Sequence, residues 1–377
     1  MLKYDYLCRM QETAVRILVA PLDWGLGHAT RCIPVIESLK RRGCEVLIAG
    51  SGLGGELLSK RFPDLVFEPL PSYNITYSRK GSMAVHLLKQ LPQLLSIIRD
   101  ERNALEQIIA KHQVSCIISD NRYGLYNSGV KSIFMTHQIH ISSGRNWKWI
   151  DQALFVLHRK FIEKFDEVWI VDEPEHEKGK WAGKLSSSNG LRIPYRYVGL
   201  LSRFSHNNES KLGSNEMSFQ RIALLSGPEP QRGLLEHKML QYFDGLPGKS
   251  LVVRGIAGDE VRVDKNTTIF NGIDDSTLRK AISSNPIVYC RSGYSTLMDL
   301  LHLHHARAVF IPTPGQTEQA YLADRFARMY GFTHVEQGMM FPDEVEIAEA
   351  QYPKLDNRDF LEDSIDSLLD EPSKRST

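Results

Sequence analysis

Long apolar runs, an excess of one charge and closely spaced cysteines are all missing from this sequence, and each absence excludes a class of protein. No stretch reaches the roughly 18–20 consecutive apolar residues that a membrane-spanning helix requires, so we expect no integral membrane segment. The 46 Lys and Arg residues are almost balanced by 45 Asp and Glu residues. A formal net charge of +1 excludes a general nucleic-acid binder, because neutralising phosphates needs a clear basic excess.

The five cysteines are widely scattered, and none belongs to a Cys-x-x-Cys pair. A disulfide framework or a structural zinc site needs closer and more regular spacing, so we expect reduced thiols in a cytosolic compartment. The opening residues 1–12 mix Lys, Arg, Asp and Glu, which is unlike a secretory signal. We therefore predict a cytoplasmic protein, with peripheral attachment to the inner face of the cytoplasmic membrane as an alternative.

What the sequence has is a chain of 377 residues, 42% of them hydrophobic and 24% charged, which is the composition of an ordinary globular protein. At about 100–200 residues per domain, this length predicts two domains. The stretch 202–219 is rich in Ser, Asn and charge, and we interpret it as a linker. The predicted units are an N-terminal domain over 1–201, this linker, a C-terminal domain over 220–355, and a terminal helix with a tail over 356–377.

Short apolar runs alternate with longer amphipathic segments along both halves of the chain, which indicates strands and helices alternating in parallel sheets. In the first half we predict strands at 15–20, 45–49, 65–68, 114–119, 131–136 and 167–171, and helices at 29–42, 54–62, 83–111 and 147–165. In the second half we predict strands at 221–225, 250–254, 267–270, 286–290 and 307–312, and helices at 231–243, 275–283, 292–303 and 317–329. The predicted fold class is α/β, with two Rossmann-like, doubly wound parallel-sheet domains.

In such sheets, ligands bind at the carboxyl ends of the strands, where the following helices begin. The first turn of this kind, DWGLGHATR at residues 23–31, contains Gly25 and Gly27, which permit close approach to a ligand. His28 opens the next helix, whose dipole disfavours imidazolium and so keeps the side chain available as a base. We assign Gly25, Gly27 and Arg31 to an acceptor or phosphate loop. A plain glycine turn with a histidine near the helix start is the alternative.

A second turn, at residues 289–299, runs from a strand into a helix and concentrates hydroxyl groups at the helix start. Backbone N–H and side-chain O–H donors in this position are typical of a diphosphate site. The carboxylate of Asp299, two turns into the helix, is placed to accept from ribose hydroxyl groups. The candidate donor-binding residues of this turn are Arg291, Ser292, Gly293, Ser295, Thr296 and Asp299. A Ser/Thr-rich helix cap is the alternative.

The run RSGYSTLMDLL…FIPTPGQTEQAYLADRF resembles the donor-binding half of MurG-type glycosyltransferases of the GT-B fold, and GLGHATR is similar to the glycine-rich turn of their acceptor domain. Ile273 lies in a segment similar to the one that meets the nucleotide base. Ser226 and Gly227 stand where the family has a Gly-Gly-Ser turn at the diphosphate. The resemblance implies a nucleotide sugar bound in a cleft between two facing domains, with Glu318 and Gln319 on the donor side.

Three positions depart from the pattern of the peptidoglycan enzyme. Asp299 replaces a longer Glu, Ala320 replaces a second Gln, and Pro228 removes one N–H donor from the diphosphate turn. These departures leave the donor sugar open, and a UDP-linked N-acetylhexosamine is implied only by the resemblance.

Glycosyl transfer with inversion needs a base for the acceptor hydroxyl group and stabilisation of the leaving diphosphate. We predict His28 as the base and Asp120, at the end of a predicted strand, as the carboxylate that orients it. An Asx turn is the alternative interpretation of Asp120. The chain contains no Asp-x-Asp motif, the usual carrier of Mg²⁺ to a sugar nucleotide, so we expect no metal and no cofactor. We expect His302, His304 and His305 to be solvated.

Aromatic and cationic residues interleave over 145–161, a pattern typical of a helix at a membrane interface, and 83–98 is a second candidate. Both segments lie in the N-terminal half, which favours a glycan or lipid-linked acceptor at an anionic membrane surface. The alternative is helices that pack on the sheet while their Lys and Arg side chains reach solvent.

The predicted function is an inverting glycosyltransferase that moves a sugar from a nucleotide diphosphate donor to a hydroxyl acceptor without a metal. Two alternatives stay open: a sugar-nucleotide hydrolase or epimerase on the same fold, and a non-catalytic nucleotide-sugar-binding protein. No nucleic-acid partner is expected.

Overall fold

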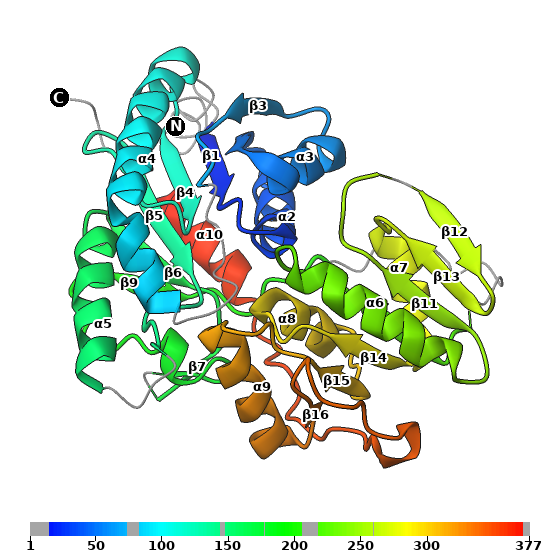
Figure 1. Cartoon of the computed structure of the whole chain (residues 1–377). Coiled ribbons are helices and arrows are strands. Elements are labelled where there is room, and N and C mark those ends of the chain that lie inside the picture. Colours follow the sequence, from blue (N-terminus) through cyan, green and yellow to red (C-terminus); the bar gives the residue numbers. More distant parts are fainter. Residues whose placement is uncertain are drawn as a thin grey trace.

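The computed structural model describes residues 15–73, 83–143, 148–176, 178–205, 218–258 and 260–371. These residues form two α/β domains, each built on a seven-stranded sheet (Figure 1). The fold class predicted from the alternation of apolar and amphipathic segments is confirmed.

The first sheet has the strand order β3-β2-β1-β4-β5-β6-β9, and all its pairings are parallel. Its strands are β1 (Arg16–Pro21), β2 (Glu45–Gly50), β3 (Val66–Pro69), β4 (Cys116–Asp120), β5 (Lys131–Thr136), β6 (Glu167–Ile170) and β9 (Tyr195–Tyr197). The chain begins at β1 in the middle of the sheet and adds β2 and β3 towards one edge, then crosses back and adds β4, β5, β6 and β9 towards the other. The direction in which strands are added therefore reverses between β1 and β4. In doubly wound sheets, the carboxyl ends beside such a reversal form the usual ligand site.

Helices cover both faces of this sheet because its strands are buried on both sides. The helices are α2 (Leu26–Arg41), α3 (Gly52–Arg61), α4 (Met83–His112) and α5 (Lys148–Ile162). Alternate residues of β1 show the two-sided packing: Ile17 and Val19 share a core with α2, whereas Leu18 and Ala20 share one with α4. Figure 1 shows α4 and α5 on the same side of the sheet.

The second sheet has the order β12-β13-β11-β10-β14-β15-β16. Its strands are β10 (Arg221–Leu224), β11 (Ser250–Val253), β12 (Val261–Asp264), β13 (Thr267–Phe270), β14 (Ile287–Cys290), β15 (Ala308–Phe310) and β16 (Thr333–His334). The predicted all-parallel sheet needs one correction, because β12 pairs antiparallel with β13. Only two residues join these strands, which is too short for a parallel crossover and suits a hairpin.

The helices of the second domain are α6 (Gln231–Asp244), α7 (Asp275–Ser283), α8 (Tyr294–His302) and α9 (Thr317–Tyr330). Side chains of α7, α8 and α9 belong to the same buried apolar cluster as α2 and one face of the first sheet. The core therefore runs without interruption from one domain into the other, and α2 and α8 are in contact across the boundary.

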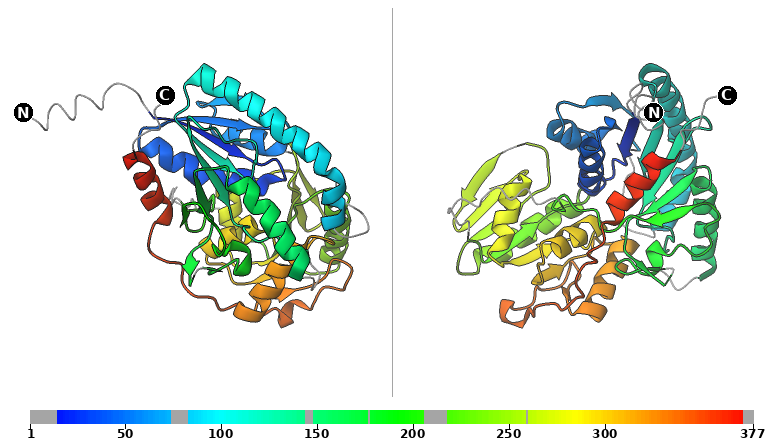
Figure 2. Two further views of the ribbon diagram at one scale, coloured as in Figure 1. Left: turned by 90° about the vertical axis from the view of Figure 1, so that its left-hand side faces the viewer. Right: turned by 180° about the vertical axis from the view of Figure 1, so that it is seen from behind.

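The C-terminal helix α10 (Phe360–Asp370) crosses back to the first domain and lies beside α2 in both views of Figure 2. Leu361, Ile365 and Leu368 are buried in the shared core. Glu362 forms an ion pair with Arg42 and accepts a 2.7 Å hydrogen bond from Ser38 Oγ. The chain thus passes between the domains twice, once before β10 and once before α10.

Several short elements were not expected from the sequence. They are the strands β7 (Pro174–Glu175), β8 (Lys178–Gly179), β9, β12 and β16, and the 3₁₀ turns η1 (Lys184–Ser186) and η2 (Glu344–Glu346). The predicted linker is also buried at its ends, where Ser202, Phe204 and Phe219 are almost inaccessible, and its middle part, 206–217, lies outside the described residues. No helix in the described parts of the chain combines the length and apolar character needed to cross a bilayer.

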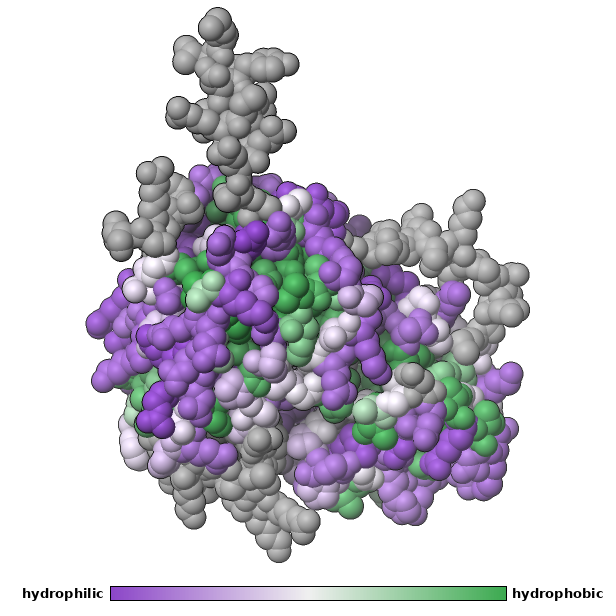
Figure 3. All heavy atoms as spheres, turned by 90° about the horizontal axis from the view of Figure 1, so that it is seen from above, coloured by the Kyte–Doolittle hydropathy of each residue, from purple (hydrophilic) through white to green (hydrophobic). Residues whose placement is uncertain are grey.

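A groove of about 590 Å³ lies at the starting ends of β1, β2 and β3, opposite the reversal point's carboxyl ends. Its charged side chains are paired, Arg16 with Glu45 and Lys40 with Asp64 at 2.6 Å each, and Lys111 and His112 with Glu68 at 2.7 Å each. On the face seen from above, hydrophilic side chains predominate among the described residues and apolar ones form smaller patches (Figure 3). Because the charged side chains that line the groove are already in ion pairs, none of them is free to act as a catalytic base.

Candidate functional site

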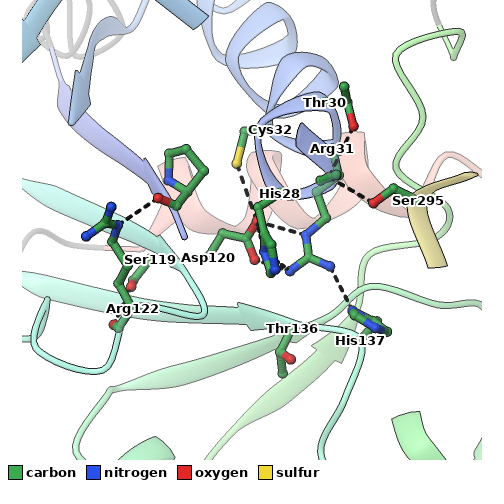
Figure 4. Close-up of polar contacts among 12 residues, drawn as sticks. His28, Thr30, Arg31, Cys32, Ser119, Asp120, Arg122, Thr136, His137 and Ser295 are labelled. Carbon is green, nitrogen blue, oxygen red and sulfur yellow. Dashed lines mark hydrogen bonds and ion pairs between the residues drawn. The ribbon is translucent and has the colours of Figure 1, made fainter. Parts of the chain in front are cut away.

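The first predicted turn and Asp120 meet at the reversal point of the first sheet. β1 pairs with β4 so that Pro21 lies opposite Asp120, and the backbone N–H of Leu22 donates to the Asp120 carbonyl oxygen at 2.9 Å. This register brings the start of α2 above the end of β4. His28 Nδ1 lies 3.1 Å from Asp120 Oδ2, so the two residues predicted as base and orienting carboxylate are in contact (Figure 4).

Arg31 lies one helical turn after His28 and is buried against the same carboxylate. Its guanidinium bonds both oxygens of Asp120, with Nε at 2.8 Å from Oδ2, and a further nitrogen lies 2.8 Å from His28 Nδ1. The assignment of Arg31 to an acceptor or phosphate loop stays a prediction, and any contact with a ligand competes with these bonds. The side chain is 2% exposed, and its donors are directed at Asp120 and two histidines.

His137 is a member of this group that the sequence interpretation missed. It directly follows β5, is 5% exposed, and places Nδ1 at 2.7 Å from a guanidinium nitrogen of Arg31 (Figure 4). The rule that selected Asp120, a polar residue at the carboxyl end of a predicted strand, applied equally to His137. We call His28, Arg31, Asp120 and His137 the His28 cluster.

The charges within the His28 cluster fix its protonation at neutral pH. Burial first, and the positive charge of Arg31 second, lower the pKa of His28 below its usual 6.5, although Asp120 acts in the opposite direction. Burial tends to raise the pKa of Asp120, but Arg31 and His28 outweigh it and hold this pKa at about 2. His28 is therefore neutral and Asp120 ionised, which are the states required of a base and of the carboxylate that orients it.

The two glycines of the first turn have distinct structural reasons. Gly25 precedes α2 with a φ of 85°, a conformation that residues with a Cβ rarely adopt. A Cβ on Gly27 would lie 3.0 Å from Ser295 Oγ of the other domain. Gly25 therefore permits the turn before α2, and Gly27 allows the start of α2 to approach the second domain closely.

The second predicted turn lies directly across from the first. α8 begins at Tyr294 after Gly293, and no side chain caps its first N–H groups. Ser295 Oγ donates to the Gly27 carbonyl oxygen at 2.8 Å, and Ser292 Oγ donates to the Gln319 carbonyl oxygen at 2.8 Å. The two hydroxyl groups predicted to meet a diphosphate thus bond backbone carbonyls here, while Thr296 lies half-buried in the first turn of α8.

Arg291 and Asp299 are committed to the protein's own structure. Arg291 is buried and donates to the carbonyl oxygens of Ile311 and Gln231, both at 3.0 Å. It therefore connects the segment after β15 to the start of α6. Burial lowers the pKa of Arg291 to about 10. Asp299 accepts from Ser202 Oγ at 2.6 Å and from Arg203 Nε at 3.0 Å. The predicted contacts of Arg291 with a diphosphate and of Asp299 with a ribose stay predictions. Either contact would compete with the hydrogen bonds that the side chain makes within the protein.

The remaining donor-side candidates line the carboxyl ends of the second sheet. Ser226 and Gly227 are exposed directly after β10, and Gly227 has a φ of 95°. Ile273 is partly buried just before α7. Gln319 Oε1 accepts from the Thr313 backbone N–H at 2.8 Å. Together with residues 291–296 and 312–319, these form what we call the donor-side turns.

Thr313 is a second residue that the sequence interpretation did not single out. Its side chain is buried, being 3% exposed, yet Oγ1 has no hydrogen-bond partner among the described residues. The nearest atom to a Cβ built on Gly227 is this same Oγ1, at 3.6 Å. A buried hydroxyl group without a partner is costly, and this one lies beside the Gly227 turn.

Glu318 joins the donor-side turns to the His28 cluster. Its Oε1 lies 2.8 Å from His137 Nε2, and Thr317 Oγ1 donates to the Ser142 carbonyl oxygen at 2.8 Å. Glu318 therefore reaches the His28 cluster across the domain boundary through its contact with His137.

The described residues contain no group of three or more His, Cys, Asp or Glu side chains arranged to hold a metal ion. Metal independence stays a prediction. The expectation that the histidines after α8 are solvated is wrong for His305, which is buried with Nε2 at 3.0 Å from the Arg307 carbonyl oxygen.

No protein-family model matches this sequence, and a comparison with curated proteins finds no match either. The fold is similar to that of solved glycosyltransferases. One of them is the spinosyn rhamnosyltransferase SpnG, which was solved with thymidine diphosphate and with spinosyn aglycone. The alignment with its thymidine diphosphate complex covers 95% of this chain and 92% of SpnG, at 14% identity and a TM-score of 0.55. SnogD of Streptomyces nogalater matches over 94% of both chains at 13% identity and a TM-score of 0.55.

The MurG of Acinetobacter baumannii matches over 95% of this chain and 91% of its own, at 14% identity and a TM-score of 0.49. At such identities a likeness establishes the fold, and SpnG and SnogD cover both domains of this chain. The chain therefore has the two-domain GT-B fold of glycosyltransferases.

Proposed function

We propose that this protein is a glycosyltransferase that moves a sugar from a nucleotide diphosphate donor to a hydroxyl group of an acceptor. The observation that carries the proposal is the contact of His28 with Asp120, at 3.1 Å, beside a donor-side loop of the other domain. A protein that only binds a nucleotide sugar needs no oriented imidazole of lowered pKa at this boundary.

In the proposed reaction, His28 removes the proton from the acceptor hydroxyl group. With its own proton on Nδ1, donated to Asp120, the imidazole presents Nε2 as the base. The acceptor oxygen bonds to the anomeric carbon as the bond from that carbon to the diphosphate breaks, so a single displacement inverts the configuration. The ionised Asp120 stabilises the imidazolium that forms, because their opposite charges lie in a buried site.

The proposal gives the donor-side turns the task of holding the diphosphate and the sugar. The Ser226–Gly227 turn and the uncapped start of α8 supply N–H donors, and the Thr313 hydroxyl group supplies a further donor. Glu318 and Gln319 lie where sugar hydroxyl groups would meet the His28 cluster. Mg²⁺ is not part of the proposal, because donors of this kind stabilise a leaving diphosphate without it. Uridine is the proposed nucleoside of the donor, and thymidine belongs in the test because SpnG was solved with thymidine diphosphate.

For the acceptor we propose a glycan or a lipid-linked glycan, presented to the first domain at an anionic membrane surface. In α5, Phe155 and Ile162 are buried against the sheet, whereas Trp149 is 71% exposed and Leu157 is 39% exposed. The packing alternative thus accounts for the inner face of this helix. The outer face keeps the aromatic residue that interfacial contact needs. Residues 145–147 and the side chains of 83–91 lie outside the described parts.

The test is a product assay with a panel of UDP- and TDP-sugars, run with and without glycan and lipid-linked acceptors. Transfer that depends on the acceptor supports the proposal. Release of free sugar at the same rate without acceptor would instead identify a hydrolase, in which His28 activates water. Binding of nucleotide sugars without any turnover would identify a non-catalytic binder. Thermal stabilisation by each nucleotide selects the panel first, because ligand at a hundredfold excess over its Kd adds about 2.7 kcal/mol.

A further inference from the structure

His137 has a partner on each side of the domain boundary. On the first domain, Arg31 lies 2.7 Å from Nδ1. On the second domain, Glu318 lies 2.8 Å from Nε2, and the Tyr294 ring stacks on the imidazole with centroids 4.3 Å apart and planes 12° apart. Both ring nitrogens and one ring face are therefore in use, although no step of the proposed transfer requires this residue.

The chemistry of the partners fixes where His137 carries its proton. A guanidinium group can only donate hydrogen bonds, so Nδ1 of His137 accepts from Arg31. The neutral ring then carries its proton on Nε2 and donates it to the Glu318 carboxylate. A proton on Nδ1 would face the N–H of Arg31 at 2.7 Å and break this contact. The link from Glu318 to Arg31 thus exists in one tautomer only.

Arg31 carries the link onward to the base. The same rigid guanidinium that donates to His137 also holds Asp120 and reaches His28 Nδ1 at 2.8 Å. Nδ1 of His28 therefore has two mutually exclusive bonds. It accepts from Arg31 when the proton is on Nε2, or donates to Asp120 when the proton is on Nδ1, and only the second form is a base at Nε2. The position of the guanidinium decides between the two.

We propose that His137 is a positioning residue that couples the donor-side loop at Glu318 to the tautomer of His28, acting through Arg31. This inference rests on the proposed function for its kinetic consequence, but its structural part does not. When Glu318 engages His137, the guanidinium is held by an acceptor on each side. When the loop withdraws or Glu318 turns to a sugar hydroxyl group, His137 and then Arg31 lose that constraint, and the balance at His28 changes.

Two substitutions separate the hydrogen bonds from the packing. His137→Phe keeps a ring to stack on Tyr294 but has no acceptor for Arg31 and no donor for Glu318. His137→Gln keeps both, because its amide oxygen accepts and its amide nitrogen donates. We expect H137F to lower kcat by roughly ten- to a hundredfold, as small misplacements of a base do, with the Kd of the nucleotide diphosphate unchanged. We expect H137Q to retain kcat within about threefold.

The structural readout is the ¹⁵N signals of the imidazole nitrogens, observed by NMR in the full-length protein without substrate. We expect the His28 nitrogen signals to shift in H137F and to stay as in the wild type in H137Q. Should H137F fail to fold, Glu318→Leu removes the same bond from the other domain, with Glu318→Gln as its matched control. E318L is then expected to shift the His28 signals, and E318Q to leave them unchanged.

Unchanged His28 signals in H137F or E318L overturn the coupling, and so does an H137Q variant as impaired as H137F. Absence of turnover by the wild-type protein with every nucleotide sugar, together with the expected NMR shifts, overturns the proposed function and leaves the coupling in place. The two failures are therefore distinguishable.

Discussion

The two halves of the candidate site are built on opposite principles. In the His28 cluster, the side chains are bonded to one another, and Arg31 contacts all three of the others, Asp120, His28 and His137. In the donor-side turns, hydroxyl groups bond backbone carbonyls, the start of α8 has no side-chain cap, and Thr313 Oγ1 has no partner among the described residues. The first half is complete without a ligand and suits proton transfer. The second half has hydrogen-bond donors that no side chain of the described residues satisfies, which suits the binding of an anion.

The largest effect is expected where the first half is broken at its centre. Asp120→Asn keeps the shape but removes the negative charge that Arg31 contacts directly, which costs about 3–5 kcal/mol of unfolding free energy. We also expect kcat to fall by roughly 10²–10⁴, because Asn favours the wrong tautomer of His28. Denaturant unfolding and single-turnover kinetics measure the two effects. The control is Asp64→Asn at an exposed ion pair, which should change neither.

His28→Ala tests catalysis without disturbing the charge balance. We expect kcat to fall by at least about 100-fold, since a positioned base contributes that much, while the nucleotide Kd barely moves. His112→Ala, at the pair with Glu68 far from the site, serves as the control and should retain full kcat. An H28A rate within about threefold of the wild type in a single turnover would falsify the assignment of the base.

The pH profile tests the electrostatics of the same residue. Only the neutral form of His28 accepts a proton, and burial together with Arg31 lowers its pKa below 6.5. As pH falls, activity should therefore persist below pH 6.5 and then decline about tenfold per unit once His28 becomes protonated. The measurement is log kcat/KM against pH. An acid limb centred above 6.5 contradicts the lowered pKa.

Thr313→Val tests the second half, where we expect a smaller effect on binding and none on folding. Loss of the hydroxyl group should weaken nucleotide diphosphate binding roughly tenfold, the value of about one good hydrogen bond to a charged group. The stability of the free protein should not fall, because the hydroxyl group has no partner among the described residues. Ser250→Ala, which removes a partner of Arg221 at the other end of the sheet, should leave the Kd unchanged. Calorimetry reports both variants.

The smallest effect is expected on the outer face of α5. Trp149→Ser at this exposed position should change stability by less than about 0.5 kcal/mol. Co-flotation with anionic lipid vesicles should nevertheless drop severalfold if this face meets a membrane. Val261→Ser, on the exposed edge of the second sheet, is the matched control. Wild-type protein that does not float at all removes the membrane from the proposal and leaves sugar transfer untouched.

The fold followed from local patterns, because a buried parallel strand and an amphipathic helix each have a period that can be read without knowing the rest of the chain. The pairing of His28 with Asp120 also followed, since neighbouring strands in a doubly wound sheet bring their carboxyl ends together. β12 was missed because its solvent-exposed residues, Val261 to Asp264, do not form an apolar run.

The roles of individual polar residues depended on long-range contacts. Whether Arg31 faces a ligand or a carboxylate is decided by β4, whose end lies 89 residues later in the chain. Asp299 is occupied by Ser202 and Arg203, which lie 97 and 96 residues earlier. No local pattern contains these distances, so the sequence located the two turns at the ends of strands but not the partner of every side chain within them.

The return of α10 to the first domain limits how the molecule can move. The two connections, one before β10 and one before α10, lie beside each other, because a Cβ on Gly199, just before the first, would lie 3.3 Å from the side chain of Phe360, which begins α10. The domains are thus joined twice at one place, so pulling them apart or sliding them there would strain two stretches of chain instead of one.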